Sequence, residues 1–365
     1  MPIVPQGGKV LVSGANGYIA MWTVKMLLER GYRVRGTVRS ENKGRFLNDY
    51  FAKLGHGDAF EFAIVEDFLE DDAFDEVIKD VDAIAHMASP VHSKPSDPDE
   101  ILKPAVRGTI GILKSALKNA SRVRRIVVTS STATIITPDL TAARVFSEED
   151  WNEACPKEVK ELGAKARGVS IYRASKVLAE RAAWDFYKQH KSQIQWDLTV
   201  INPPFVFGPP IHDVRSPKSL NLSLLAWYQR LVSESPEEKD ELSHWSCGWV
   251  DVRDTALAHV MALEKEAAGG ERIMTPSGRC FWQEWINAVN SLKQIHSLHT
   301  NLLSDAPNFF MSTLFLARWT SLRKSEFLGS NSRLWRRRPR IRWRTSRGAG
   351  GRNALVNTYR PPYRT

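Results

Sequence analysis

A tyrosine and a lysine stand four residues apart in the segment Tyr172-Arg-Ala-Ser-Lys176. The surrounding residues 171–189 predict a helix, and side chains at positions i and i+4 share one helix face. A phenol with its ordinary pKa of about 10 exchanges protons poorly at neutral pH, but an ammonium one turn away stabilises the phenolate and lowers that pKa. The pair is therefore predicted to do acid–base chemistry, although an isolated Tyr-x-x-x-Lys is usually a surface pair.

Ser131 directly follows a predicted strand at residues 125–130. A serine hydroxyl at a strand end can hydrogen-bond a carbonyl oxygen as that oxygen gains negative charge. We therefore expect the catalytic residues to be Ser131, Tyr172 and Lys176.

A strand, a glycine turn and a helix open the chain. Residues 9–13 are apolar and β-branched, and the turn that follows has the spacing Gly14-x-x-Gly17-x-x-Ala20. Glycines let a backbone approach a pyrophosphate, and the helix N-terminus faces its negative charge. The turn is predicted to bind a nucleotide, whereas plain packing of strand against helix is the alternative. The residues assigned to this contact are Gly14, Asn16, Gly17, Tyr18 and Ile19.

The end of the second predicted strand, 33–38, indicates which cofactor binds. An acidic residue there would hold the ribose hydroxyls of NAD, but this chain has Arg39, with Lys43 close behind. Two cations in this place can clamp a 2′-phosphate. NADPH is therefore the predicted cofactor, and two solvated surface cations are the alternative.

Two further pairs of residues follow predicted strands. Asp67 and Phe68 come after residues 60–65 and are expected to bracket the adenine edge, unless Asp67 only caps a helix. Ala88 and Ser89 come after residues 81–86, at the carboxyl edge where such sheets bind ligands.

The same strands alternate with helices along the chain. Helices are predicted at 71–79, 101–119 and 171–189, and a further strand at 196–202 runs into a Pro- and Gly-rich segment at 202–210. Strands separated by helices predict an α/β fold with a doubly wound parallel sheet. The Pro/Gly segment marks the start of a smaller substrate-side lobe.

Composition excludes several classes of protein. The 365 residues are 42% hydrophobic and 25% charged, which is typical of a globular protein. Residues 291–365 carry a net charge of +13 and residues 1–290 one of −3, so the main body has no footprint for a polyanion. Three scattered cysteines lack the spacing of a metal site, and no metal is predicted. No leader or membrane span is recognisable, so a cytoplasmic protein is expected.

At this point the chain resembles the extended short-chain dehydrogenase/reductase family, in the NAD-dependent epimerase/dehydratase superfamily. Its branch is that of dihydroflavonol reductases, cinnamoyl-CoA reductases and fungal aldehyde or ketone reductases. The resemblance covers residues 8–290 and implies a Rossmann fold. It rests on seven motifs in order, namely Val-Ser-Gly14-Ala-Asn-Gly17-Tyr-Ile-Ala20, Gly-Thr-Val-Arg39, His86-Met-Ala-Ser-Pro90, Thr129-Ser-Ser131, Tyr172-x-x-x-Lys176, Asn202-Pro-Pro-Phe-Val-Phe-Gly208 and Val250-Asp-Val-Arg-Asp254.

The resemblance also implies roles. Tyr172 would protonate the substrate oxygen, Lys176 would hold the nicotinamide ribose, Ser131 would orient the carbonyl and Pro203 would place the nicotinamide. NADPH would reduce an aldehyde or ketone to an alcohol, with secondary metabolism as an expected setting. Ile136 stands where plant dihydroflavonol reductases place an Asn, which disfavours a flavonoid substrate. The family fold groups an apolar substrate pocket from Ser89, Ile136, Phe205, Trp227, Tyr228 and Trp245.

Other interpretations stay open. A nucleotide-sugar epimerase or dehydratase would share Ser131, Tyr172 and Lys176 but retain NAD, and a regulator could bind NADPH without catalysis. We expect a domain at 1–290 with substrate-side elements at about 203–250 and 276–290. The Arg-rich tail 291–365 is atypical and is interpreted as out-of-frame or unspliced sequence. The alternatives are a basic arm for nucleic acid or acidic lipid and a localisation signal. A monomer or homodimer that acts on a small molecule is expected.

Overall fold

A computed structural model describes residues 3–89, 97–138, 144–232, 246–282, 285, 287, 341–347 and 353–357. Two compact units divide the chain. The first comprises residues 1–138, 148–203 and 253–275, and the second comprises residues 139–147, 204–252 and 276–365. Trp245, one of the predicted pocket residues, lies outside the described residues.

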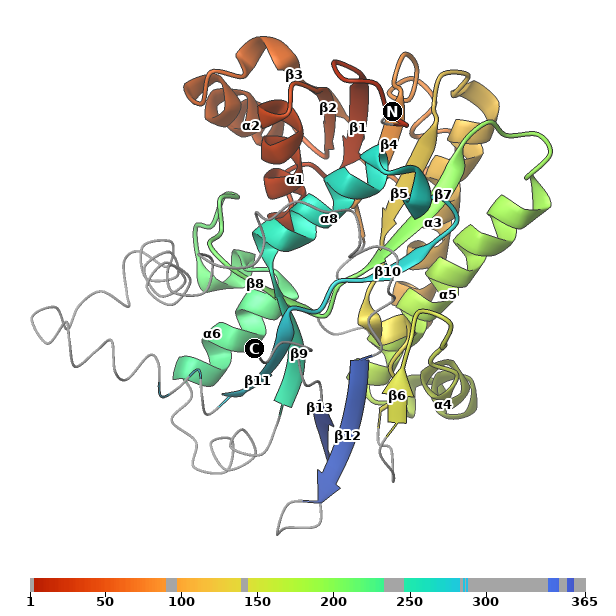
Figure 1. The fold of residues 1–365 in the computed structure, drawn as a ribbon, viewed down its shortest axis with the longest axis vertical. Coiled ribbons are helices and arrows are strands. Elements are labelled where there is room, and N and C mark those ends of the chain that lie inside the picture. Colours follow the sequence, from red (N-terminus) through yellow and green to blue (C-terminus); the bar gives the residue numbers. More distant parts are fainter. Residues whose placement is uncertain are drawn as a thin grey trace, which may run out of the picture. The chain divides into compact units, whose positions relative to one another are not determined.

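A seven-stranded sheet organises the first unit (Figure 1). Every pair of neighbouring strands in it is parallel, in the order β10-β7-β5-β4-β1-β2-β3. Helices cover both faces of such a sheet, so the side chains of its central strands are buried on both sides. In β4, for example, all four residues are buried. The strands are β1 (Lys9–Ser13), β2 (Arg33–Val38), β3 (Phe60–Ile64), β4 (Ala83–His86), β5 (Arg125–Thr129), β7 (Asp197–Asn202) and β10 (Arg272–Met274).

This strand order confirms the predicted doubly wound Rossmann sheet. The chain builds β1, β2 and β3 in one direction and then returns to place β4 on the other side of β1. Ligands bind outside the carboxyl ends of strands at such a switch point. The neighbourhood of Ser13 and His86, the last residues of β1 and β4, is therefore where a nucleotide is expected.

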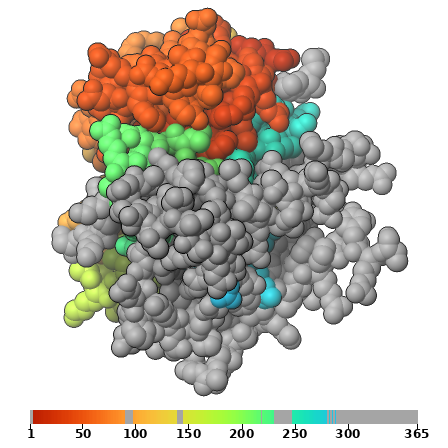
Figure 2. All heavy atoms as spheres, turned by 90° about the vertical axis from the view of Figure 1, so that its left-hand side faces the viewer, coloured from red at the N-terminus to blue at the C-terminus, as the bar shows by residue number. Residues whose placement is uncertain are grey.

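The helices are α1 (Tyr18–Glu29), α2 (Glu41–Lys53), α3 (Asp99–Asn119), α4 (Ala154–Leu162), α5 (Gly168–Gln189) and α8 (Val252–Glu264). The long helices α3 and α5 lie side by side and bury apolar residues against the sheet, among them Ile112 and Ala183. On the other face α1 and α8 are joined by an ion pair between Arg30 and Glu264 (2.9 Å). Figure 2 shows the N-terminal elements, in red and orange, as one continuous surface.

The helix predicted for residues 71–79 is wrong. The segment forms consecutive turns, although Phe74 and Ile78 are buried at the helical spacing that suggested it. Asp72 and Asp80 both have positive φ, 63° and 62°, a left-handed conformation that interrupts a right-handed helix.

The second unit has two small sheets. β9 (Ser246–Asp251) pairs in parallel with β8 (Phe205–Phe207) and antiparallel with β11 (Gly278–Phe281). The other sheet joins β6 (Arg144–Phe146) to β12 (Ile341–Arg347) and β13 (Asn353–Asn357), so part of the basic tail is in strands. Helix α6 (Leu222–Val232) completes the unit. The predicted boundary at residue 290 and the nature of the tail stay predictions.

Candidate active site

The glycine turn after β1 has the form that the sequence predicted. Gly14 has φ +64°, and a Cβ on it would lie 3.1 Å from the Cα of Ala88, so only glycine fits without strain. Its N–H donates to the hydroxyl of Thr37 (3.2 Å), and the Ala88 N–H donates to the hydroxyl of Ser13 (3.0 Å). The turn from β1 thus lies directly against the residues that follow β4.

The start of α1 suits a phosphate. Gly17 is the N-cap, no side chain caps this end, and the first turn has no acidic residue. Unopposed backbone N–H groups at a helix N-terminus attract anions. Asn16 and Ile19 are half-buried and Tyr18 is buried around this turn, and their contact with a nucleotide stays a prediction.

Arg39 and Lys43 lie at the carboxyl end of β2 and in the first turn of α2. Both side chains are exposed, and the preceding Thr37 carbonyl accepts from the Ala15 N–H (3.0 Å), which ties this strand end to the glycine turn. A cation in the first turn of a helix opposes the helix dipole unless it meets an anion. This donor set fits the 2′-phosphate of NADPH.

The two residues after β3 differ in their surroundings. Asp67 is exposed and its Oδ1 accepts from the Leu69 N–H (2.8 Å), closing a turn. Phe68 packs on the core, and a Cβ on Gly108 of α3 would lie 2.3 Å from its ring. Phe68 therefore has a fixed position, while the carboxylate of Asp67 stays at the surface.

A cavity of about 20 Å³ brings four predicted site residues together. Phe68, Ala88, Ser89 and Lys176 all line it, together with Glu180 and residues of β4, β5 and α3. The Nζ of Lys176 donates to the Oγ of Ser89 (2.9 Å). The catalytic helix and the predicted nucleotide edge are thus in direct contact.

Tyr172 and Lys176 share one face of α5, as their spacing predicts, with the Lys176 Nζ 6.0 Å from the centre of the Tyr172 ring. Ser131 caps the short helix at 132–134, where its Oγ accepts from the Ala133 N–H (3.1 Å). That hydroxyl also lies close enough to the phenol of Tyr172 to influence its pKa. The structure therefore brings the three predicted catalytic side chains into one site.

The proton affinities differ from the expectation in one respect. Burial raises the pKa of Tyr172, while the nearby hydroxyl of Ser131 and the charge of Arg173 oppose that rise. The ammonium of Lys176 is turned toward Ser89 and does not produce the expected depression of the phenol's pKa. Burial lowers the pKa of Lys176 to about 8, against the opposing charge of Glu180. A protonated phenol is the form that can donate to a carbonyl oxygen.

Two predicted residues flank this group. Pro203 is buried after β7, and its carbonyl accepts from the Thr132 N–H (3.0 Å) and the Ser131 hydroxyl (3.4 Å). Ile136 is half-buried, and its carbonyl accepts from Arg173, the neighbour of Tyr172 (3.0 Å). Both backbones are therefore fixed to catalytic segments.

The remaining predicted pocket residues belong to the second unit. Phe205 is half-buried and its ring lies 6.0 Å from that of Phe207. Trp227 is fully buried against Trp285, with ring centres 6.2 Å apart, so its indole is a core side chain of that unit. Tyr228, next to it, is half-buried. Their contact with substrate stays a prediction.

Sequence reasoning missed Glu180 and its partner Arg272. Glu180 lies one turn after Lys176 and is 2% exposed, with its Oε1 2.5 Å from the Nε of Arg272. The i+4 spacing from Lys176 was a visible signal for Glu180. Nothing in the local pattern points to Arg272, which is 92 residues away.

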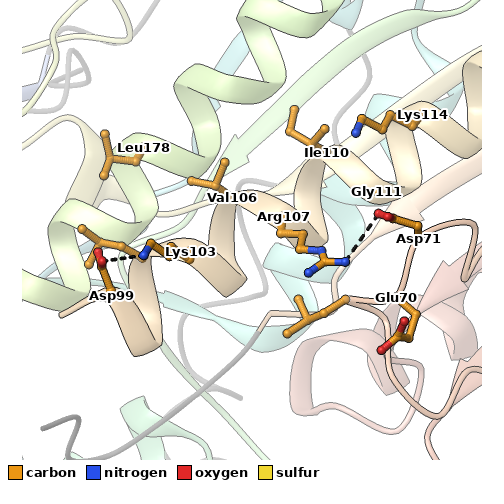
Figure 3. A pocket seen from close by; sticks show the side chains of 12 residues that line it. Glu70, Asp71, Asp99, Lys103, Val106, Arg107, Ile110, Gly111, Lys114 and Leu178 are labelled. Carbon is orange, nitrogen blue, oxygen red and sulfur yellow. Dashed lines mark ion pairs between the residues drawn. The ribbon is translucent and has the colours of Figure 1, made fainter. Parts of the chain in front are cut away.

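A larger hollow of about 450 Å³ lies on the outer side of α3 and contains none of the predicted site residues (Figure 3). Two ion pairs lie in its wall, between Lys103 and Asp99 (2.7 Å) and between Arg107 and Asp71 (3.5 Å). This hollow contributes nothing to the chemistry described above. Among the described residues, no group of acidic, histidine or cysteine side chains is arranged to hold a metal, and no helix is long and apolar enough to cross a membrane.

Comparisons with known proteins agree with this geometry. Residues 10–274 match the family model described as the NAD dependent epimerase/dehydratase family. The ketoreductase azaE of Aspergillus niger is 38% identical over 287 residues, which cover 74% of this chain and 78% of that protein. The NADPH-dependent methylglyoxal reductase GRE2 of Saccharomyces cerevisiae is 36% identical over 289 residues, covering 77% and 81%. The crystal structure of Gre2 from Candida albicans in complex with NADPH has a TM-score of 0.70 at 36% identity, covering 79% of this chain and 82% of that one. This chain belongs to the NAD dependent epimerase/dehydratase family.

Proposed function

We propose that this protein reduces the aldehyde or ketone group of a small or medium-sized hydrophobic molecule. The chain is an oxidoreductase, an NADPH-dependent carbonyl reductase, as are the named relatives whose sequences it matches over about three quarters of its length. The observation that carries the proposal is the joint placement of Ser131, Tyr172 and Lys176 beside the nucleotide edge.

The cofactor site is proposed from residues at the carboxyl ends of β1, β2 and β4. Gly14 and Gly17 leave room for the pyrophosphate, Arg39 and Lys43 bind the 2′-phosphate, and Ser89 lies with Lys176 toward the nicotinamide ribose. Asp67 and Phe68 flank the adenine, and Pro203 faces the nicotinamide. When bound, NADPH supplies the hydride that the carbonyl carbon accepts.

The proposed acid is Tyr172. Burial keeps its phenol protonated, so it can donate the proton to the substrate oxygen as negative charge develops there. The hydroxyl of Ser131 orients that oxygen by a hydrogen bond. Lys176, whose ammonium donates to the hydroxyl of Ser89, is proposed to hold the nicotinamide ribose beside the phenol.

The substrate is proposed to be apolar on the side of Ile136. A half-buried isoleucine offers no hydrogen bond to substrate hydroxyls, so polyphenolic molecules are disfavoured. Phe205, Trp227 and Tyr228 are proposed for the substrate side of the second unit, and the full burial of Trp227 makes its part that of a supporting wall. The protein is proposed to work as a monomer or homodimer in the cytoplasm, where the buried thiols of Cys155 and Cys247 would stay reduced.

The experiment is to follow the loss of NADPH absorbance with aromatic, aliphatic and terpenoid aldehydes and ketones. Wild type should turn over part of this panel, and Tyr172→Phe should lose turnover while it still binds NADPH. Tightly retained NAD together with conversion of a nucleotide sugar would instead identify an epimerase. NADPH binding without turnover in wild type would also contradict the proposal.

A further inference from the structure

Glu180 is a buried carboxylate that the catalytic chemistry described above does not use. It follows Lys176 by one turn of α5 and Tyr172 by two turns, so all three side chains lie on the same face of the helix. Its side chain is 2% exposed, and a carboxylate so deeply buried is costly unless all its lone pairs find donors and a counter-charge.

Four side chains satisfy this carboxylate. Its Oε2 accepts from the Ser130 hydroxyl (2.5 Å), the Thr134 hydroxyl (2.8 Å) and the Asn202 amide (2.8 Å). Its Oε1 accepts from the Nε of Arg272 (2.5 Å). These donors come from three separate segments of the first unit, namely the loop after β5, the end of β7 and the start of β10.

Three of the donors adjoin residues of the proposed site. Ser130 precedes Ser131, and Asn202 precedes Pro203. The Asn202 amide also donates to the Ser131 carbonyl (3.2 Å), and the Thr134 hydroxyl lies 2.9 Å from that same oxygen. The carboxylate therefore joins the loop after β5 and the loop after β7 to the helix that carries Tyr172 and Lys176.

Arg272 provides the counter-charge. Its guanidinium also donates to the carbonyls of Glu148 (2.7 Å) and Asp150 (2.8 Å) and stacks 3.8 Å above the ring of Trp151. These contacts hold the cation where it meets Glu180, and the guanidinium also donates to the Thr134 hydroxyl (3.1 Å), one of the donors to the same carboxylate. A planar guanidinium suits such a fixed, many-contact position.

We propose that Glu180, charge-balanced by Arg272, is a positioning residue for carbonyl reduction that fixes the segments of Ser131 and Pro203 against α5 and keeps Lys176 in its ammonium form. The inference rests on the proposed roles of Tyr172, Lys176 and Ser131. It adds that the segments of Ser131 and Pro203 are held in place by the buried carboxylate of Glu180 and not by packing alone.

The electrostatics around Lys176 support this role. Burial lowers the pKa of Lys176 to about 8, and the negative charge of Glu180 raises it. Among the residues that the structure describes, the other titratable neighbours are the phenol of Tyr172 and the imidazole of His86, whose pKa is lowered to about 4 by burial and by Lys176. His86 is therefore neutral near pH 7, which leaves Glu180 as the charge that stabilises the ammonium.

The test is Glu180→Gln, which keeps the shape of the side chain and removes its charge. We expect kcat to fall about tenfold and the upper limb of its pH profile to move down by about one pH unit, because Lys176 loses its proton earlier. NADPH affinity, measured by fluorescence without substrate, should start to fall at a correspondingly lower pH.

Asp197→Asn is the matched control. Asp197 opens β7, the strand that Asn202 closes, and makes a two-pronged pair with the buried Arg125 (2.5 and 2.7 Å) at the opposite end of the sheet. We expect this variant to lower Tm but to leave both pH profiles unchanged. If Glu180→Gln lowers Tm in the same way with wild-type pH profiles, the role of Glu180 is purely structural and the proposal is wrong.

Thr134→Val tests the positioning part if Glu180→Gln does not fold. It keeps both charges and removes one donor to the carboxylate, so kcat should fall several-fold with an unmoved pH limb; an unchanged kcat would contradict the proposal. Tyr172→Phe is measured in parallel. If it keeps its turnover, the proposed function fails; if it is inactive while Glu180→Gln behaves as wild type, only the role of Glu180 fails.

Discussion

The ammonium of Lys176 donates to the hydroxyl of Ser89 across 2.9 Å, although 87 residues separate them in the chain. Ser89 follows β4 and Lys176 is on α5, so this contact joins the strand end nearest the switch point of the sheet to the helix that carries the acid. The strand end proposed to bind the nucleotide and the helix proposed to carry the acid–base residues therefore meet at one hydrogen bond.

Removing the ammonium should cost far more than removing its hydroxyl partner. For Lys176→Met we expect kcat to fall about 100-fold or more, because the ammonium proposed to hold the nicotinamide ribose beside the phenol is lost and the reacting groups are no longer aligned. Ser89→Ala removes one hydrogen bond, worth about 1 kcal/mol, and should weaken NADPH affinity about fivefold. Steady-state kinetics measure kcat, and fluorescence titration measures NADPH affinity. If Ser89→Ala lowers kcat as much as Lys176→Met does, the two residues do not have the separate roles proposed for them.

Arg39 should set the preference for NADPH over NADH. Arg39→Ala removes a charged hydrogen bond to the 2′-phosphate and is expected to weaken NADPH affinity about tenfold, with NADH affinity unchanged. The matched control is Arg45→Ala, which removes another exposed cation on α2 that is already paired with Glu41 (3.1 Å). A loss of the same size for NADH would show that Arg39 does not contact the phosphate.

Gly14 should tolerate alanine less well than Gly31 does. Both have positive φ, +64° and +82°, so either substitution strains the backbone by about 1–2 kcal/mol. At Gly31 a Cβ meets nothing within 4 Å, whereas at Gly14 it would lie 3.1 Å from Ala88. Urea unfolding should show the larger loss for Gly14→Ala, and only this variant should lose NADPH binding. Normal binding in Gly14→Ala would contradict the assignment of the turn.

Acidification should destabilise the fold through buried neutral histidines. Burial lowers the pKa of His86 and of His259 to about 4, whereas an unfolded histidine has a pKa of about 6.5. Their stabilising contribution is therefore complete above about pH 6.5 and is lost as the pH falls toward 4, at about 1 kcal/mol for each histidine between pH 7 and 5.5.

His259 offers a direct check of that pH dependence. Its Nδ1 donates to the Thr255 carbonyl (2.8 Å) and its Nε2 accepts from the Thr129 hydroxyl (2.8 Å), a pair of contacts that a glutamine amide can also make. His259→Gln should show a smaller loss of unfolding free energy between pH 7 and 5.5 than wild type. If His259→Gln has the same pH dependence of unfolding free energy as wild type, His259 is not one of the groups responsible for the loss of stability at low pH.

Regular strands were predictable because they alternate with apolar helices and end at polar turns. The strands predicted at 33–38, 125–130 and 196–202 agree with β2, β5 and β7 to within one residue. The segment 71–79 has the apolar spacing of a helix but forms turns, because Asp72 and Asp80 adopt positive φ. Apolar periodicity indicates which side chains are buried. It does not reveal a single residue whose backbone adopts a left-handed conformation and so interrupts the helix.

The sequence alone determined the features that depend on short separations along the chain. The Gly14 turn, the shared face of Tyr172 and Lys176, and the cation at the end of β2 follow from local geometry, because three to five residues of strand, turn or helix place their own side chains. Tertiary structure decided the pairings of Lys176 with Ser89 and of Glu180 with Arg272, and the upward shift in the pKa of Tyr172. The pairings depend on the order of strands in the sheet, and the pKa shift depends on burial from water. Neither can be deduced from one segment of the sequence, because both arise only when distant segments pack together.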